Sequence, residues 1–204
     1  FAPVGDQIGQ TEHRQLNGLA DLGATLAELT GRPVDDLWKM ENGYALAEAT
    51  GLDAIGRCLS SLSPAEVDGL RERLMIGIHW GVEVTDAPAV SGQKVSQAFC
   101  SALPLGYSRA PARLWEPFAR LILEAAYEAT LCGALLNARR SPSRKVFLTL
   151  LGAGAFGNPL DWVLDALGRA LNLFREADIS VSIVSYGAPD PDLRKLVSNF
   201  ELGA

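Results

Sequence analysis

Residues 146–157 have the sequence VFLTLLGAGAFG, in which an apolar run is followed by three glycines. The run, residues 146–151, is short, rich in residues that favour strands and nearly free of polar atoms, which is typical of a strand buried on both faces of a sheet. Asn158 and Pro159 come next, and they predict a helix with Asn158 as its N-cap and Pro159 at its first position. The stretch therefore predicts an α/β fold in which a glycine loop, residues 152–157, joins a buried strand to a helix.

The glycine loop is a candidate anion site. Gly152, Gly154 and Gly157 permit positive φ angles and let a ligand approach the main chain closely. The N–H groups of such a loop and of the following helical turn lack partners within the helix and attract negative charge. A phosphate or pyrophosphate is the expected occupant. The predicted ligand-binding residues here are Gly152, Ala153, Gly154, Ala155, Phe156, Gly157 and Asn158.

The loop also matches G-x-G-x-x-G, the dinucleotide-binding fingerprint. A domain of that kind needs an acidic residue at the tip of the next strand, roughly 20 residues later, to bind the ribose 2′-hydroxyl. The next predicted strand, residues 179–186, ends in Ser185 and Tyr186 and has no acid there. A nicotinamide-dependent oxidoreductase with a variant loop is therefore the alternative and not the first choice.

Residues 152–159, GAGAFGNP, resemble the second phosphate loop of macrodomains, a family of ADP-ribose-binding domains. The similarity extends to residues 95–104 (VSQAFCSALP), to Tyr107 and to a long predicted helix over residues 115–137, and it covers roughly residues 95–197, half of the chain. The resemblance implies a mixed β-sheet sandwiched between helices. It also implies binding of ADP-ribose, as a reader or as a hydrolase of ADP-ribosyl groups. With only two histidines in the chain we expect no zinc site, and we expect no cofactor.

The resemblance implies ligand contacts outside the loop as well. In the family, the strand end that corresponds to Ser185 and Tyr186 borders the adenosine half of the ligand. We therefore expect Tyr186 to contact the base and Phe156 to pack against a ribose. A tyrosine that caps the core at the edge of the sheet is the alternative for Tyr186. The carboxyl ends of neighbouring strands form the ligand crevice of open α/β sheets, which places this strand end beside the loop.

Residues 5–10, GDQIGQ, followed by His13 and Arg14, are similar to the end of the family's first ligand loop. The ligand contacts implied there are Gln7, Ile8 and Gly9. Asp6, the only carboxylate among residues 5–10, is the candidate general base of a hydrolase. An ordinary lead into a helix, with a surface histidine, explains the same residues and remains the alternative.

The composition indicates a single domain over residues 1–204, since 48% of the residues are hydrophobic and 21% are charged. The net charge is −6 without a large Lys/Arg cluster, which disfavours a nucleic-acid partner. Cys58, Cys100 and Cys132 lie in apolar surroundings, as expected for buried thiols in a reducing compartment. The sequence shows no signal peptide and no run of 18 apolar residues, so we expect a cytoplasmic protein without a membrane partner.

The chain starts at Phe1 and not at Met. We therefore expect that an N-terminal portion lies outside it, and that an N-terminal segment or a partner chain completes the fold.

Turn signals and periodicity predict the remaining elements. They are helix 11–29, hairpin 37–46 around an Asn42-Gly43 turn, helices 51–62 and 63–74, strands 75–85 and 95–103, helices 115–137 and 162–174, strand 179–186 and a closing helix after residue 190.

Glu124 and Glu128 lie one turn apart on the longest helix. A solvated helix face is the favoured interpretation of this pair, and an acid–base or metal pair is the alternative.

Three functions remain open: a nucleotide-diphosphate binder, an oxidoreductase, and an interaction domain that has lost its ligand.

Overall fold

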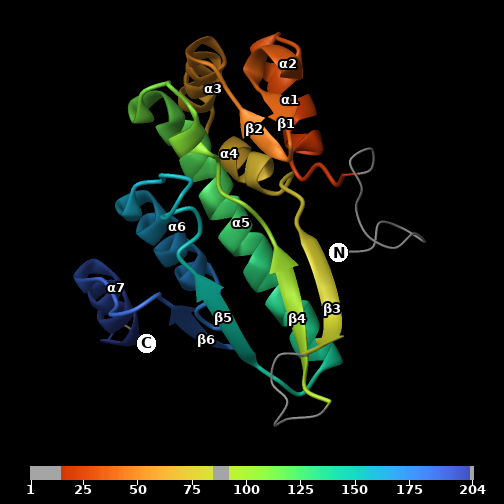
Figure 1. Ribbon diagram of the computed structural model, residues 1–204, viewed down its shortest axis with the longest axis vertical. Helices are drawn as coiled ribbons and strands as arrows, with labels where there is room; N and C mark the ends of the chain where they lie inside the picture. Colours follow the sequence, from red (N-terminus) through yellow and green to blue (C-terminus); the bar gives the residue numbers. More distant parts are fainter. Residues whose placement is uncertain (1–14, 85–91, 203–204) are drawn as a thin grey trace.

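The computed structural model describes residues 15–84 and 92–202 of the chain. It contains both helices and strands, which confirms a mixed α/β class (Figure 1). The elements are, in order, α1 (Ala20–Thr30), α2 (Val34–Leu37), β1 (Lys39–Glu41), β2 (Tyr44–Leu46), α3 (Ala49–Ser61), α4 (Pro64–Arg71), β3 (Gly77–Glu83), β4 (Lys94–Phe99), a 3-10 turn (Leu105–Tyr107), α5 (Ala112–Arg140), β5 (Lys145–Thr149), α6 (Leu160–Leu173), β6 (Ser180–Val184) and α7 (Pro191–Leu202).

The strands form three separate pairs among the described residues. β1 and β2 are an antiparallel hairpin, β3 and β4 are antiparallel with an irregularity between His79 and Val82, and β5 and β6 are parallel, with Val146 opposite Val181. Figure 1 shows β4 and β5 pointing in the same direction over α5. No described strand lies between them to connect the two pairs, so the expected single mixed sheet is not formed in this part of the chain.

Several elements follow local signals. The hairpin turns at Asn42 and Gly43, whose φ angles of 50° and 82° are the left-handed values that a two-residue turn requires. Helix α4 begins with the predicted capping box: the N–H of Ser63 donates to Glu66 Oε2 (2.8 Å) and the N–H of Glu66 donates to Ser63 Oγ (3.4 Å). Helix α1 ends at Gly31 as predicted, but it begins at Ala20, later than expected.

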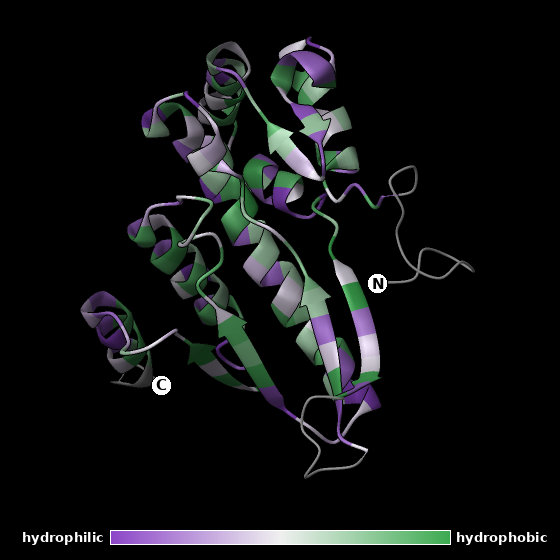
Figure 2. Cartoon of the chain, viewed as in Figure 1, coloured by the Kyte–Doolittle hydropathy of each residue, from purple (hydrophilic) through white to green (hydrophobic). Residues whose placement is uncertain are grey.

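Helix α5 forms the centre of the core. Trp115, Phe118 and Leu131 on this helix are fully buried, and α3, α4 and α6 pack against it. Trp38, which follows α2, lies against Phe118 with the ring centroids 5.1 Å apart. Figure 2 shows that β5 is hydrophobic along most of its length. By length and composition alone α5 could cross a membrane, but in this fold it is the helix around which the domain packs.

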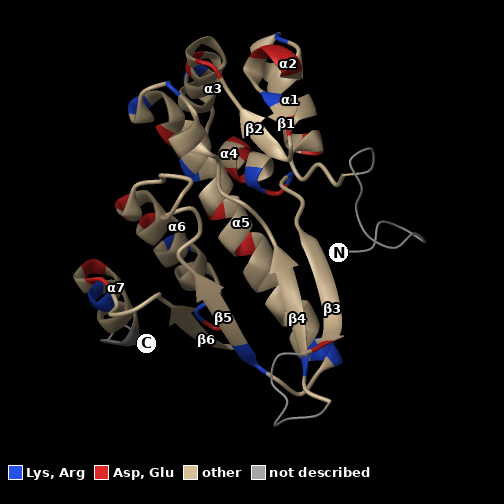
Figure 3. Ribbon diagram, in the orientation of Figure 1, with Lys and Arg blue, Asp and Glu red and all other residues tan. Residues whose placement is uncertain are grey.

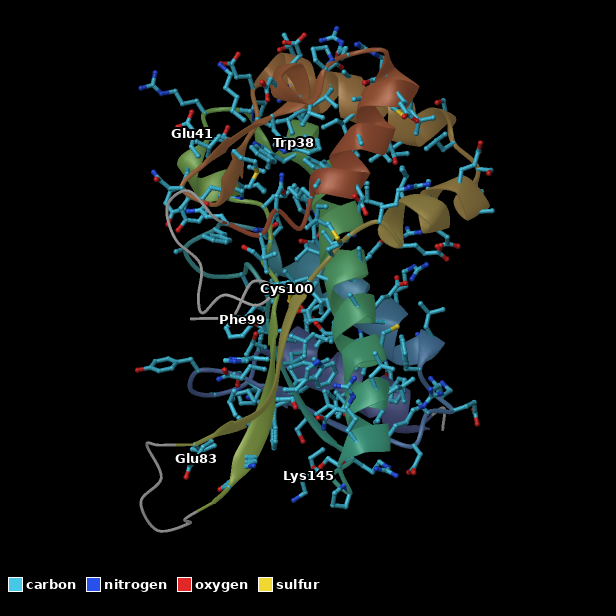
Figure 4. The ribbon with its side chains drawn as sticks, turned by 90° about the vertical axis from the view of Figure 1, so that its right-hand side faces the viewer. Trp38, Glu41, Glu83, Phe99, Cys100 and Lys145 are labelled. Carbon is cyan, nitrogen blue, oxygen red and sulfur yellow. The ribbon has the colours of Figure 1, made fainter. Side chains whose placement is uncertain are left out.

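The described helices cover one face of the strands only. Leu148 of β5 is 3% exposed, whereas its neighbour Phe147, which points to the opposite face, is 67% exposed. Figures 1 and 4 show α5 and α6 on one side of the strands and no described helix on the other. β5 is therefore not buried on both faces, which corrects the expectation from its composition.

Charged residues link α4, α5 and α6 (Figure 3). Arg71 Nε donates to Glu124 Oε2 (2.7 Å), Arg169 pairs with Glu128, and Arg169 Nη2 donates to Asp68 Oδ1 (2.7 Å). Burial raises the pKa of Glu128, and the charges of Arg169 and Arg71 oppose that rise. Glu124 and Glu128 thus form ion pairs between helices. The expectation of a solvated face is wrong, because arginines on two neighbouring helices reach both carboxylates.

Candidate functional site

The glycine loop lies between β5 and α6, at the carboxyl end of the strand. Gly152 and Gly157 have φ angles of 77° and 70°, which glycine adopts without strain, whereas Gly154 lies outside the positive-φ region. The N–H of Asn158 donates to Gly152 O (3.0 Å) and the N–H of Gly157 donates to Gly154 O (2.9 Å). The loop is therefore a compact turn held by its own main chain.

The segment that follows β4 holds the loop in place. Asn158 Nδ2 donates to Leu103 O (2.9 Å) and to Gly152 O (3.3 Å). The N–H of Gly106 donates to Phe156 O (2.8 Å). The bond to Leu103 O joins residues that are 55 positions apart in the sequence, and the bond from Gly106 joins the same two segments. The loop is therefore held both by hydrogen bonds of its own main chain and by hydrogen bonds to the segment that follows β4.

Asn158 does not have its predicted role. Helix α6 begins at Leu160, Pro159 occupies the N-cap position, and no side chain caps the helix. Asn158 is 3% exposed, and its amide group is used to tie the loop to the β4 segment. The N-cap prediction is wrong because a long-range contact takes up the side chain that local sequence assigns to the helix end.

Three consecutive N–H groups of the loop, those of Gly154, Ala155 and Phe156, donate no hydrogen bond to a described residue. Gly154 and Ala155 are exposed, and a Cβ on Gly154 would meet no atom within 4 Å. The loop thus leaves a row of main-chain donors without a partner in a largely exposed turn. Successive donors of this kind bind anions, and the start of α6 adds the positive end of a helix dipole.

Three aromatic rings gather beside the loop. The Phe156 centroid lies 5.6 Å from that of Tyr44 and 5.9 Å from that of Tyr107, and the two tyrosine rings are 5.6 Å apart. Tyr44 and Tyr107 are 38% and 57% exposed, so both retain free ring surface. The loop sequence predicts Phe156 at the site, whereas no local signal brings the β1–β2 hairpin, and with it Tyr44, to the loop.

Ser185 and Tyr186 follow β6, which pairs in parallel with β5, so they lie at the same end of this strand pair as the loop. Ser185 Oγ donates to Gly187 O (3.2 Å). Tyr186 is fully exposed and has no ring contact with a described residue. The end of β6 is thus next to the end of β5, from which the glycine loop starts, while the Tyr186 side chain points into solvent.

The residues of the first predicted ligand loop lie outside the described residues, so their predicted roles stay predictions. These residues are Asp6, Gln7, Ile8 and Gly9.

A cavity of about 530 Å³ lies at the carboxyl end of β4. Its walls include Tyr44, Phe99 and Cys100. Figure 4 shows that Phe99 points away from α5 and Cys100 toward it, where the Cys100 sulfur lies 3.7 Å from Thr130 Oγ1. Tyr44 belongs both to this wall and to the aromatic group, so the cavity adjoins the aromatic side of the glycine loop.

The titratable groups near the cavity offer little acid–base chemistry. Burial raises the pKa of the Cys100 thiol, which favours its protonated form, although the contact with Thr130 opposes that rise. Within residues 15–84 and 92–202 no group of three His, Cys, Asp or Glu side chains could hold a metal ion. Cys132 is exposed and not buried as expected, because no described element covers its position on α5. The site is therefore made of main-chain donors and aromatic surface.

Comparisons with known proteins return no match: no family model matches the sequence, no curated protein matches it, and no solved structure matches the fold.

Proposed function

We propose that the glycine loop binds the diphosphate of ADP-ribose or of a related nucleotide. The observation that supports this most is the row of N–H groups at Gly154, Ala155 and Phe156, which have no partner among the described residues and lie in a largely exposed turn. A hydrogen bond to a charged group contributes about 1.5–3 kcal/mol. Three such bonds would dominate the binding of a diphosphate.

ADP-ribose is proposed over other diphosphates because residues 152–159 resemble the macrodomain loop. The order β4, α5, β5, loop, α6, β6 agrees with the order that this resemblance implies. A macrodomain-like arrangement, with the strands joined in one mixed sheet, is part of the proposal. The partners would then be ADP-ribose itself or an ADP-ribosylated protein.

Isothermal titration calorimetry with ADP-ribose, ADP and NADH tests the ligand. We expect ADP-ribose to bind most tightly and NADH not to bind, because Ser185 stands where a nicotinamide-binding domain has an acid. Tighter binding of NADH would favour the oxidoreductase. Binding of none of the three would favour an interaction domain that has lost its ligand.

Replacement of Tyr186 by alanine is expected to lower the affinity for ADP-ribose about tenfold, because stacking on a base contributes roughly 1–3 kcal/mol. Tyr186 is fully exposed at the end of the strand next to the loop strand, so its ring is free to turn toward a bound base. Calorimetry measures the change, and Phe156→Ala tests the ribose contact in the same way. If Tyr186→Ala binds as tightly as the parent, the base lies elsewhere, and Tyr107 is the next residue to replace.

A hydrolase is the proposed extension of this binding site. Cleavage of an ADP-ribosyl bond requires the distal ribose to be held with a base beside its anomeric carbon. Asp6 is the candidate base from the sequence. With mono- and poly-ADP-ribosylated protein as substrates, Asp6→Ala should release ADP-ribose about 100-fold more slowly than the parent and still bind it. An unchanged rate would remove Asp6 from the mechanism, and tight binding without turnover in the parent would identify a reader.

A further inference from the structure

The cavity at the carboxyl end of β4 is enclosed by segments from distant parts of the chain. Its walls are formed by residues 16–19, the β1–β2 hairpin, residues 74–77, residues 98–104 and Ile122 of α5. Its volume is about 530 Å³, whereas close-packed protein interiors leave few voids larger than a water molecule. Ligand pockets of proteins measure about 300–1,000 Å³. The cavity therefore has the size of a binding site and not that of a packing defect.

The wall of the cavity is uncharged. None of the described residues that line it carries a charge. Two of its polar side chains are bonded within the protein: Asn17 Oδ1 accepts a hydrogen bond from the N–H of Leu19 (3.0 Å). Ser101 Oγ donates to Ala102 O (3.0 Å). A charged ligand would lose its hydration here without gaining a counter-ion, so the wall favours an uncharged one.

Large apolar side chains of the wall keep much of their surface uncovered. The following side chains are 38–53% exposed: Leu16, Met40, Tyr44, Met75 and Phe99. They come from different segments of the chain, and all of them line this one cavity. Exposed apolar side chains that gather at one place often mark a binding site, whereas single ones are common on any surface. A bound molecule would remove this apolar surface from water, which is favourable.

Close contacts between the segments hold the walls in place. The N–H of Met75 donates to Gly18 O (3.0 Å). A Cβ on Gly18 would overlap Met75 O, so the close approach of these two segments depends on glycine. On the opposite wall the Cys100 sulfur lies 3.7 Å from Thr130 Oγ1 of α5. A cavity with fixed walls loses little conformational freedom when it binds a ligand.

We propose that this cavity is a second binding site, which takes a small, uncharged aromatic molecule. The rings of Tyr44 and Phe99 offer stacking and edge contacts to such a molecule. The thioethers of Met40 and Met75 interact favourably with aromatic rings, and their flexible side chains adapt to the shape of a ligand. The site uses none of the N–H groups of residues 154–156 and does not depend on the binding of a diphosphate there.

Titration of the protein with N-phenyl-1-naphthylamine tests this. The probe is uncharged and aromatic, and its fluorescence rises in apolar surroundings. We expect a saturable rise with one probe bound per chain and a dissociation constant on the order of 10 μM.

Alkylation by N-ethylmaleimide, followed by mass spectrometry of the peptides, locates the bound probe. Cys100 lines the cavity, so a probe concentration of about ten times the dissociation constant should slow its alkylation about tenfold. Cys132 is exposed on α5 outside the cavity and is the internal control. Its alkylation rate should not change.

Met75→Glu places a charge in the wall and should lower the affinity for the probe about tenfold. Leu136→Glu is the matched control, because Leu136 and Met75 are both 46% exposed and Leu136 does not line the cavity. This control should bind the probe as tightly as the parent. Gly154→Val should also bind it as tightly, which separates this site from the glycine loop.

The absence of saturable binding overturns the proposal. So does equal affinity in Met75→Glu and the parent, or unchanged alkylation of Cys100 when the probe is bound, because the probe would then lie on another apolar surface. Loss of probe binding in Gly154→Val would place it at the glycine loop and overturn the proposal as well. If the melting curve shows that Met75→Glu does not fold, Met40→Glu on β1 takes its place with the same expected loss.

Discussion

Replacement of Gly154 by valine is expected to abolish measurable binding of ADP-ribose, a loss of at least about 100-fold, or 2.7 kcal/mol, with no change in the melting temperature. A Cβ on Gly154 meets no atom within 4 Å, and Gly154 is not among the positive-φ glycines, so the fold accepts a side chain there. The new methyl groups stand beside the N–H groups that we assign to the diphosphate, and we expect them to obstruct the approach of the ligand. Calorimetry measures the affinity, and melting followed by circular dichroism measures the stability.

Gly69→Val is the matched control. Gly69 lies in α4, and a Cβ there also meets no atom within 4 Å, so this variant should bind ADP-ribose as tightly as the parent. Gly154→Ala should have an intermediate affinity, because one methyl group obstructs the loop less than three carbon atoms do. Retained affinity in Gly154→Val would place the ligand elsewhere on the protein. A fall in melting temperature together with affinity would indicate a folding defect and not a blocked site.

Local signals predicted most of the elements because they act over a few residues. The hairpin at Asn42, the capping box at Ser63 and the helix end at Gly31 each depend on neighbours in the sequence. The strand, glycine turn and helix around Gly152 were predicted in the correct order for the same reason. Gly152 has a positive φ because the turn after β5 requires one, and only glycine adopts such a φ without strain.

Contacts between distant residues were not predictable in this way. Asn158 has the sequence pattern of an N-cap, but its bond to Leu103 O determines its role. Glu124 lies on a face that helical periodicity assigns to solvent, and Arg71 on another helix pairs with it. The exposure of Phe147 depends on whether a further layer covers the sheet, which the composition of β5 does not report. The first two errors come from a partner far away in the sequence, and the third comes from the lack of a described layer over Phe147.

Replacement of Gly152 by alanine is expected to destabilise the fold by about 3 kcal/mol, in contrast to the substitutions at Gly154. Its φ of 77° costs about 1–2 kcal/mol for a residue with a Cβ. The new Cβ would also overlap the methyl group of Ala102 and lie 2.7 Å from Asn158 Nδ2. Overpacking of this kind costs about 1–3 kcal/mol. The overlap falls on the contact that ties the loop to the β4 segment, so the bond from Asn158 to Leu103 O should be lost as well.

Urea unfolding followed by tryptophan fluorescence measures this loss, and two other glycines of the loop provide a graded comparison. Gly157 has a φ of 70°, but a Cβ there would lie 3.3 Å from Gly106 N, so Gly157→Ala should cost little more than the backbone strain, about 1–2 kcal/mol. Gly154→Ala should cost almost nothing. A Gly152→Ala protein as stable as Gly154→Ala would mean that the β4 segment does not hold the loop. The N–H groups assigned to the diphosphate would then lack the fixed geometry that tight binding of an anion requires.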